Sequence, residues 1–345
     1  MIQVRLDDPD RPWHDPGVYR VAPGVHRVPL PLPGDGLRAV NIYIIETPTG
    51  VTLVDAGQIE SGADERLTQS LDALGYSIGD IGQVLVTHMH RDHYTLAVWL
   101  RRRTGVSVAL GKGESESLAV SHTDAFVLAP QIAELRRCGA DSIIDSLADY
   151  TGRDGIPADI WEPPDTWLTD GTVISAGQRA LTAVATPGHT AGHMVFHDAA
   201  NDLLFAGDHV LPHITPSLGF EGVPAPNPLR DFLGSLRRVR ELPDAMLLPA
   251  HGSAVGSAHR RIDELLAHHD LRLDQTLAAV RAGRQTAFEV ARGLTWTRHR
   301  RRLDDLDPFN AMLATLETAA HLKLLALQGK ILTEDRDTVV AYQLG

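Results

Sequence analysis

The segment THMHRDH, residues 87–93, follows the apolar run QVLV and carries four side chains of metal-ligand type. An apolar run rich in β-branched residues predicts a buried strand. The loop that begins where such a strand ends is a common place for catalytic groups on a rigid scaffold. In an extended segment His88 and His90 point to the same side, whereas Asp92 and His93 follow as the chain turns. Two pairs of ligands at two points predict two metal ions rather than one.

A histidine-rich surface loop is the simpler interpretation of this segment, since the chain contains 17 histidines in 345 residues. A short motif separates from a chance cluster only when its surroundings confirm it. Four ligand-type residues directly after a buried strand favour the metal site. The remainder of the chain supplies the further context.

The composition is that of an ordinary globular protein, with 43% hydrophobic and 22% charged residues. The net charge of −12 disfavours non-specific binding to nucleic acid or to an anionic membrane. The single cysteine, Cys138, excludes an internal disulfide and fits a reducing compartment. The polar, acidic N-terminus shows no signal peptide, and no apolar run approaches about 18 residues. We therefore expect a cytoplasmic protein with no membrane partner.

Composition and patterning divide the chain into three regions. Residues 1–17 are rich in Asp and Pro and predict a loosely held N-terminal arm. Residues 18–255 contain two strand-rich halves with helices between them, and layered packing of helices on sheets is the natural arrangement. Within them, residues 114–165 are mostly helical, as in an insertion that either caps the core or covers a site as a lid. The third region is residues 256–345.

The third region predicts three helices followed by a hairpin. Apolar residues recur at helical spacing through residues 258–282. Thr286 and Glu289 have the form of a capping box, and the pair Asp307-Pro308 opens another helix. The final KILTEDRDTVVAYQ has the pattern of a hairpin. Three helices and a hairpin are the layout of a winged-helix domain.

Three more ligand-type residues stand just past strands in the second half of the chain. His189 lies in TPGH after the strand LTAVA, Asp208 lies in FAGDH after LLFA, and His251 lies in LPAHG after AMLL. Gly or Pro fixes the backbone at each of these positions. We expect all three to converge on the edge of the sandwich that carries THMHRDH.

These four motifs, in this order and each after a strand, resemble the metallo-β-lactamase superfamily over residues 18–255. The resemblance implies an α+β fold, namely a four-layer αββα sandwich with a small C-terminal helical (winged-helix-like) domain. It also implies a two-metal site. The implied ligands are His88, His90 and His189 for the first metal, Asp92, His93 and His251 for the second, and Asp208 as the bridge.

Several other residues have weaker assignments. Asp55 in VTLVDAG matches an aspartate that supports the ligand loops in the superfamily. His193 and His209 adjoin the ligand motifs, and we expect them to support the site without binding metal. Tyr94 and His213 are candidates for substrate contact, although core packing explains Tyr94 equally well.

The ligand types fit a hydrolytic metal centre. Imidazole and carboxylate suit two zinc ions, and iron or manganese occupy similar sites. Two metals about 3.5–4 Å apart share a water and lower its pKa, so that the resulting hydroxide attacks an electrophilic carbonyl or phosphorus. Asp92 and Asp208 would then be the catalytic carboxylates that hold the metals around this nucleophile. No serine or cysteine nucleophile is required.

Departures from known branches narrow the resemblance. True β-lactamases usually carry Cys or Ser where this chain has Asp208. The layout is more similar to the glyoxalase-II-like and lactamase-beta-2-like groups, which implies hydrolysis of a thioester, an ester or a lactone. One alternative is a metal-dependent endoribonuclease or phosphodiesterase. Another is an iron-dependent sulfur dioxygenase on the same fold.

A local cluster of arginines keeps the nucleic-acid alternative open. Seven arginines lie opposite one acid, Glu289, in this part of the chain: Arg281, Arg284, Arg292, Arg298, Arg300, Arg301 and Arg302. Such a patch suits RNA phosphates or the phosphate of an acyl-CoA, although a solvated face explains it most simply. The expected partner is a small-molecule acyl substrate, with nucleic acid second. The oligomeric state stays open, and a homodimer is one form.

Overall fold

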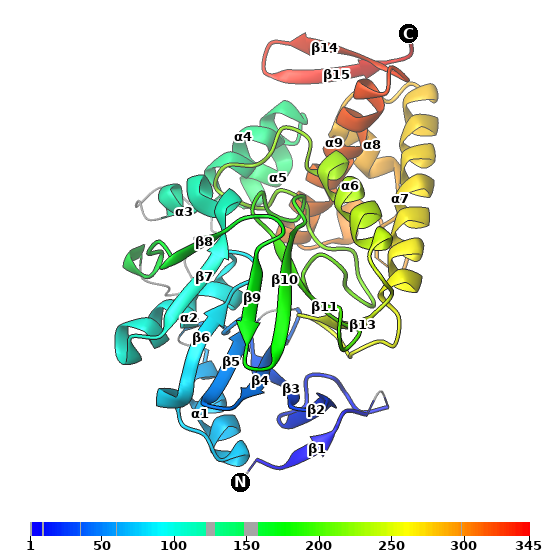
Figure 1. Cartoon of the computed structure of the whole chain (residues 1–345). Helices are drawn as coiled ribbons and strands as arrows, with labels where there is room; N and C mark the ends of the chain where they lie inside the picture. The colour runs from blue at the N-terminus through cyan, green and yellow to red at the C-terminus, as the bar shows by residue number, and fades with distance from the viewer. Residues whose placement is uncertain are drawn as a thin grey trace.

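The computed structural model describes residues 2–8, 10–34, 36–59, 61–121, 128–147, 158–297 and 299–345. Two sheets face each other, and helices cover the outer face of each sheet (Figure 1). This arrangement confirms the predicted four-layer αββα sandwich. Parts of the predicted helical insertion, and Arg298 of the arginine cluster, lie outside the described residues.

The first sheet has eight strands that follow chain order. They are β1 (Val4–Leu6), β2 (Val18–Ala22), β3 (Val25–Pro31), β4 (Ala39–Thr47), β5 (Gly50–Val54), β6 (Ile81–Leu85), β7 (Ser107–Gly111) and β8 (Thr166–Leu168). Strands β2 to β5 are antiparallel, and β5 to β8 are parallel. Parallel pairing requires crossovers, and α1 (Ala63–Leu74) and α2 (Arg91–Thr104) supply two of them. Both helices bury their apolar side chains against this sheet.

The second sheet has five strands. Its order is β13 (Met246–Pro249), β12 (Leu203–Gly207), β11 (Met194–Asp198), β10 (Arg179–Ala185) and β9 (Val173–Ala176). Apolar side chains from the inner faces of both sheets form a core between them that includes Tyr43, Leu85, Phe196 and Phe205. Because the sheets are held together by this core, the strand ends of both reach a common edge.

Helices cover the outer face of the second sheet. They are α4 (Ala129–Arg137), α5 (Asp141–Ser146), α6 (Pro228–Glu241), α7 (Ala258–Arg281), α8 (Ala287–Gly293) and α9 (Pro308–Leu327), which share one apolar cluster with that face. Helix α3 (Ser115–Ser121) instead packs Leu118 into the cluster of the first sheet. Leu135 of α4, Phe232 of α6 and Leu322 of α9 belong to one apolar cluster. The described part of the insertion therefore packs as core, and its role as a lid stays a prediction.

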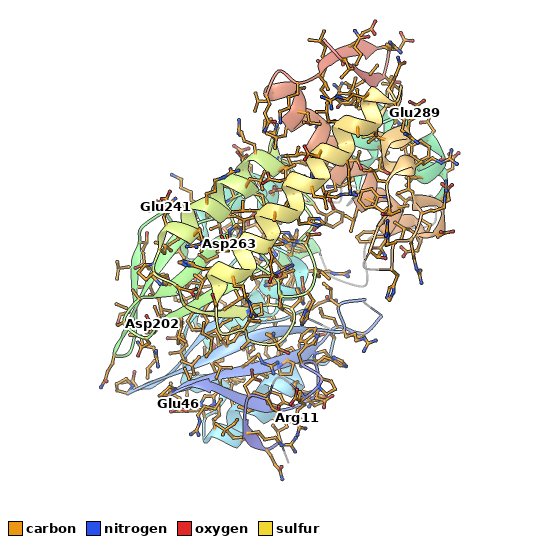
Figure 2. All side chains as sticks on the ribbon, turned by 90° about the vertical axis from the view of Figure 1, so that its right-hand side faces the viewer. Arg11, Glu46, Asp202, Glu241, Asp263 and Glu289 are labelled. Atoms are coloured by element: carbon orange, nitrogen blue, oxygen red, sulfur yellow. The ribbon has the colours of Figure 1, made fainter. Side chains whose placement is uncertain are left out.

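The C-terminal region has the elements that its sequence predicts. Helices α7, α8 and α9 are followed by the hairpin of β14 (Leu332–Arg336) and β15 (Val339–Gln343). Thr286 and Glu289 form the expected capping box, and the Asp307 side chain caps α9. Helix α7 runs from the sandwich into the C-terminal helices (Figure 2). The winged-helix arrangement itself stays a prediction.

The N-terminal arm is held more firmly than its composition suggests. Strand β1 pairs in parallel with β2. The guanidinium of Arg27, only 2% exposed, bonds to Asp7 at 2.6 Å and to the carbonyl of Trp13 at 2.7 Å. The expectation of a loosely held arm is therefore wrong, because a buried arginine fastens it to the first sheet. None of the described helices is long and apolar enough to span a membrane.

Candidate metal centre

The predicted ligands lie at one edge of the sandwich, each just past a strand. His88 and His90 follow β6, Asp92 and His93 begin α2, and His189, Asp208 and His251 follow β10, β12 and β13. The strands are buried and hydrogen-bonded, so that the positions of their ends are fixed by the sheets. The structure brings all seven residues together in two groups that share this edge.

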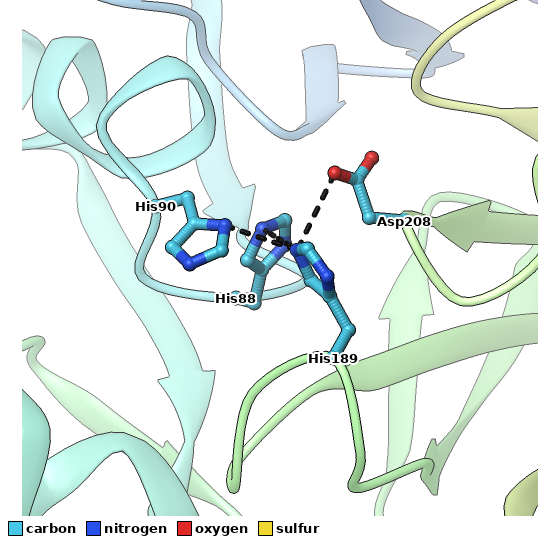
Figure 3. A group of neighbouring side chains, drawn as sticks. All are labelled: His88, His90, His189 and Asp208. Carbon is cyan, nitrogen blue, oxygen red and sulfur yellow. Dashed lines mark hydrogen bonds and ion pairs between the residues drawn. The ribbon is translucent and has the colours of Figure 1, made fainter. Parts of the chain in front are cut away.

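The first group consists of His88, His90, His189 and Asp208 (Figure 3). The His189 Nε2 atom lies 3.1 Å from His88 Nε2 and 3.0 Å from His90 Nδ1. It lies 3.4 Å from Asp208 Oδ2. Three ring nitrogens and one carboxylate oxygen thus face a common point.

The second group consists of Asp92, His93 and His251. The Oδ2 atom of Asp92 lies 3.6 Å from His93 Nε2 and 3.4 Å from His251 Nε2. The Oδ1 atom of Asp208 lies 3.7 Å and 3.4 Å from the same two nitrogens. Asp208 therefore faces the first group with one oxygen and the second group with the other, as a bridging carboxylate does.

These separations fit metal ions. Ligands at about 2.0–2.1 Å in a tetrahedron lie about 3.3–3.4 Å from one another, close to the separations in both groups. Among the described residues, His93 Nε2, His251 Nε2 and Asp208 Oδ1 are buried atoms without a hydrogen-bond partner. Buried polar atoms normally have partners, so their convergence indicates a place for cations.

Hydrogen bonds behind the rings turn the free nitrogens toward the centre. His90 Nε2 donates to the Phe220 carbonyl at 2.7 Å, which leaves Nδ1 as the acceptor. His189 Nδ1 donates to Ser217 and His251 Nδ1 donates to Ala39, which leaves Nε2 free in both. Such partners select the tautomer and the ring orientation of a metal ligand.

Asp55 has the supporting position that the resemblance implies. Its carboxylate accepts a hydrogen bond from His93 Nδ1 at 2.9 Å and others from the backbone and hydroxyl of Thr87. The Thr87 hydroxyl in turn lies 3.1 Å from His88 Nδ1. Asp55 is 2% exposed and has a left-handed backbone, with φ of 60°. One buried carboxylate thus orients a residue of each group.

The two neighbouring histidines have different environments. His193 Nε2 accepts the backbone N–H of Asp208 at 3.1 Å, and its Nδ1 donates to the Thr186 hydroxyl. It therefore fixes the backbone of the bridging residue. His209 packs against Phe232, and burial lowers its pKa to about 3. A neutral ring packed on an aromatic side chain indicates a structural role for His209.

The charge differs between the two sides of the centre. Burial lowers the pKa of His88 and His189, and lowers that of His90 to about 3, so these rings are neutral. Burial opposes protonation of His93 as well, but the carboxylates of Asp92, Asp55 and Asp208 outweigh it and raise its pKa to about 9. Positive charge is therefore favoured where the carboxylates converge, which is the electrostatic environment that a cation needs.

The two candidate substrate contacts have different outcomes. Tyr94 is fully buried in the core between α2 and the first sheet, and its hydroxyl donates to the Glu162 carbonyl at 2.5 Å. Of the two interpretations of Tyr94, the structure supports core packing, because its helix turns it into the core. His213 is exposed on the loop after Asp208, where its contact with substrate stays a prediction.

The structure adds residues that local motifs do not reveal. Trp13 of the N-terminal arm stands edge-on to His251, with ring centroids 6.4 Å apart. A tryptophan in a polar, Pro-rich arm is a weak signal for such a contact. Two buried glutamates, Glu114 and Glu221, lie behind the ligand loops and belong to no motif.

Replacing Asp55 with asparagine is expected to weaken metal binding about 10–100-fold, as loss of such partners usually does. The amide would present a donor where His93 Nδ1 and Thr87 also donate. Zinc titration of the metal-free protein measures the change. The matched control is Asp202→Asn, because Asp202 is exposed, also has positive φ (52°) and lies at the opposite end of β12 from Asp208 (Figure 2). Equal affinities of the two variants would contradict the role of Asp55.

Comparisons with known proteins agree with this geometry. The family model described as metallo-beta-lactamase superfamily matches residues 35–251. A beta-lactamase domain protein from Burkholderia ambifaria is 30% identical, with a TM-score of 0.80 over 99% of this chain and 97% of its own. A metallo-beta-lactamase family protein from Thermus thermophilus is 28% identical, with a TM-score of 0.71 over 94% of this chain and 100% of its own.

Two curated relatives carry functional names. A probable metallo-hydrolase of Bacillus subtilis is 26% identical over 88% of this chain and 92% of its own length. An atrochrysone carboxyl ACP thioesterase of Aspergillus fumigatus is 29% identical over 77% of this chain and 67% of its own length.

Proposed function

Because this chain belongs to the metallo-beta-lactamase superfamily and is a metal-dependent hydrolase, we propose that it hydrolyses acyl thioesters with two zinc ions. Esters and lactones are related substrates of the same chemistry. The observation that carries the proposal is the position of Asp208, whose two carboxylate oxygens face the two ligand groups. A carboxylate in this position supports a two-metal centre rather than a single one.

The ligands fit zinc. Five imidazoles and two carboxylates are nitrogen and oxygen donors that suit it, although they also suit iron and manganese. Two zinc ions bound here would supply a Lewis acid and lower the pKa of water toward neutrality. The chain itself contributes ligand orientation: Asp55 holds His93, His193 holds the Asp208 backbone, and carbonyls select the tautomers of His90, His189 and His251.

Aromatic side chains beside the centre support an acyl substrate. Trp13 flanks His251, and Phe220 flanks His90 with ring centroids 6.1 Å apart. Phe309, at the start of α9, packs edge-on against Phe220. The centre is thus bordered by apolar rings from the arm and from the loop after Asp208, and a ring of the C-terminal region packs against the second of these. Apolar walls with a few polar groups are typical of small-molecule sites.

The arginine cluster gives less support to an RNA substrate. Arg292 forms an ion pair with Asp304 at 3.0 Å, and the Asp305 carboxylate accepts the backbone N–H of Arg302. Nearby acids therefore offset part of the positive charge that phosphates would need. A relative named as a thioesterase adds weight to the acyl substrate.

A substrate panel tests the proposal. The zinc-loaded protein is given acyl-CoA and acyl-pantetheine thioesters, an aryl ester, a lactone and a single-stranded RNA at fixed salt. We expect thioester hydrolysis that a chelator abolishes and added zinc restores. Cleavage of RNA with every acyl substrate intact would overturn the proposal in favour of a ribonuclease. One iron per chain with no hydrolysis would favour a dioxygenase.

Truncating Trp13 to alanine is expected to raise KM for long-chain acyl thioesters about tenfold, with a smaller effect on kcat. The reason is the loss of an apolar wall, which is worth roughly 1–3 kcal/mol. The matched control is Trp99→Ala, since Trp99 is also half-buried but lies on α2 beside Arg103. If Trp13→Ala and the wild type have equal KM values at every acyl chain length, Trp13 does not contact the substrate.

A further inference from the structure

Two glutamates are buried directly behind the loops of the first ligand group. Glu114 is 0% exposed and follows β7, and Glu221 is 7% exposed and follows Phe220. Acidic side chains are almost never fully buried unless they are paired. Neither residue is one of the predicted ligands, and the proposed chemistry does not use them directly.

Glu114 joins the two loops that carry the histidines of the first group. Its Oε1 atom accepts a hydrogen bond from the Thr190 hydroxyl at 2.5 Å, and its carboxyl accepts another from the backbone of Met89. Met89 lies between His88 and His90, and Thr190 follows His189. One side chain thus holds the neighbours of all three histidines.

Close backbone contact lets Glu114 reach both loops. A side chain on Gly192 would place its Cβ 2.2 Å from the Glu114 nitrogen, and one on Gly113 would lie 2.6 Å from the Ala191 carbonyl oxygen. Both distances are shorter than any tolerated contact. Two glycines therefore allow the segment before Glu114 to lie directly on the loop after His189.

Glu221 extends the same connection to His90. It accepts hydrogen bonds from the Ser117 hydroxyl at 2.8 Å and from the backbone of Ala191. The preceding residue, Phe220, provides the carbonyl that accepts the hydrogen bond of His90 Nε2. The contacts of Glu114 and Glu221 thus meet on the loop after His189.

The environment favours uncharged carboxyl groups. Burial, together with the nearby Glu221, raises the pKa of Glu114 to about 8, and burial raises that of Glu221 to about 7. Among the described residues, Glu114 Oε2 has no hydrogen-bond partner. An amide in place of the Glu114 carboxyl group therefore keeps the accepting oxygen and leaves the charge of the site unchanged.

We propose that Glu114 is a positioning residue that holds His88, His90 and His189 in place and so sets the affinity of the first metal position alone. This inference rests on the proposed two-metal function. The second position takes its ligands from α2 and from the loop after β13, which Glu114 does not contact through any of its hydrogen bonds. The expected effect is therefore specific to one position, unlike a general loss of stability.

The experiment is zinc titration of metal-free protein against a chromophoric chelator in two backgrounds. His251→Ala leaves the first position intact, and His189→Ala leaves the second. We expect Glu114→Ala to weaken zinc binding about 10–100-fold in the His251→Ala background. In the His189→Ala background we expect a change below about threefold. Glu114→Gln should restore the affinity, because its amide oxygen accepts the same hydrogen bonds.

Two further variants keep the result interpretable. Thr190→Val removes only the hydroxyl donor, and it should lower affinity in the same background by a smaller factor. Glu241→Ala removes an exposed glutamate at the end of α6 that belongs to neither ligand group, and it should change neither affinity. Equal losses in both backgrounds, no loss in either, or failure of Glu114→Gln to restore binding would overturn the inference. A wild-type protein that binds no zinc would instead overturn the proposed function.

Discussion

Replacing Asp208 with alanine is expected to abolish thioester hydrolysis, with kcat/KM falling about 10³-fold or more. Asp208 faces both ligand groups, at 3.4 Å from His189 Nε2 and from His251 Nε2. Its loss removes a ligand from each position and one of the carboxylates that face His93 and His251. Metal-supplied stabilisation is worth several kcal/mol, and each 1.36 kcal/mol is a factor of about ten in rate.

The same variant should bind fewer than two zinc ions per chain. Metal content and initial rates, measured on one preparation, test both parts of this prediction. Asp263→Ala is the matched control, because Asp263 lies on the exposed face of α7 and pairs with Arg240 (Figure 2). Surface pairs contribute little to stability. Full activity of Asp208→Ala would contradict the bridging role.

Truncating His189 or His251 is expected to remove one metal each and to lower kcat/KM at least about 100-fold. The structure places His189 with His88 and His90, and places His251 with Asp92 and His93. Each variant should therefore retain one zinc ion, bound by the group that stays whole. If either variant still binds two zinc ions, this division of the ligands into two groups is contradicted.

A buried histidine outside the centre provides the control for these two variants. His197 lies within β11, and burial lowers its pKa, so it is neutral in the folded protein. His197→Ala should leave two zinc ions and near-normal activity, apart from a loss of stability. If His197→Ala loses metal as readily as the other two variants, the losses reflect unfolding rather than ligand removal.

Strand ends explain why much of the centre is predictable from sequence. The runs before His88, His189, Asp208 and His251 are apolar and short, so they are recognisable as buried strands, and the ligands follow directly. The order of the motifs then implies the four-layer sandwich, which the structure confirms. The structure also brings the seven residues into the two expected groups, whereas metal binding by them stays a prediction.

Long-range contacts explain what the sequence does not reveal. Glu114 meets Thr190 across 76 residues, and no local pattern encodes that pairing. The position of Tyr94 depends on the direction of a helical side chain, and the packing of α2 on the first sheet turns it into the core. The N-terminal arm has the composition of a loose segment, yet Arg27 of a neighbouring strand holds it. Each of these features arises from tertiary packing rather than from local propensity.

The C-terminal region takes part in the sandwich. Helices α7 and α9 share one apolar cluster with the outer face of the second sheet. The Arg261 side chain of α7 donates to the carbonyls of Leu211 and Ile214, on the loop that follows Asp208. The C-terminal helices thus support the loop that borders the metal centre, and Phe309 packs against Phe220 of that loop.

The number of zinc ions bound per chain tests the central claim most directly. Metal-free protein is titrated with zinc and the stoichiometry is read by mass spectrometry under native conditions. The seven converging ligands predict two ions per wild-type chain, with one ion each in His189→Ala and in His251→Ala. A wild-type chain that saturates at one ion, or that binds none, would contradict the two-metal centre.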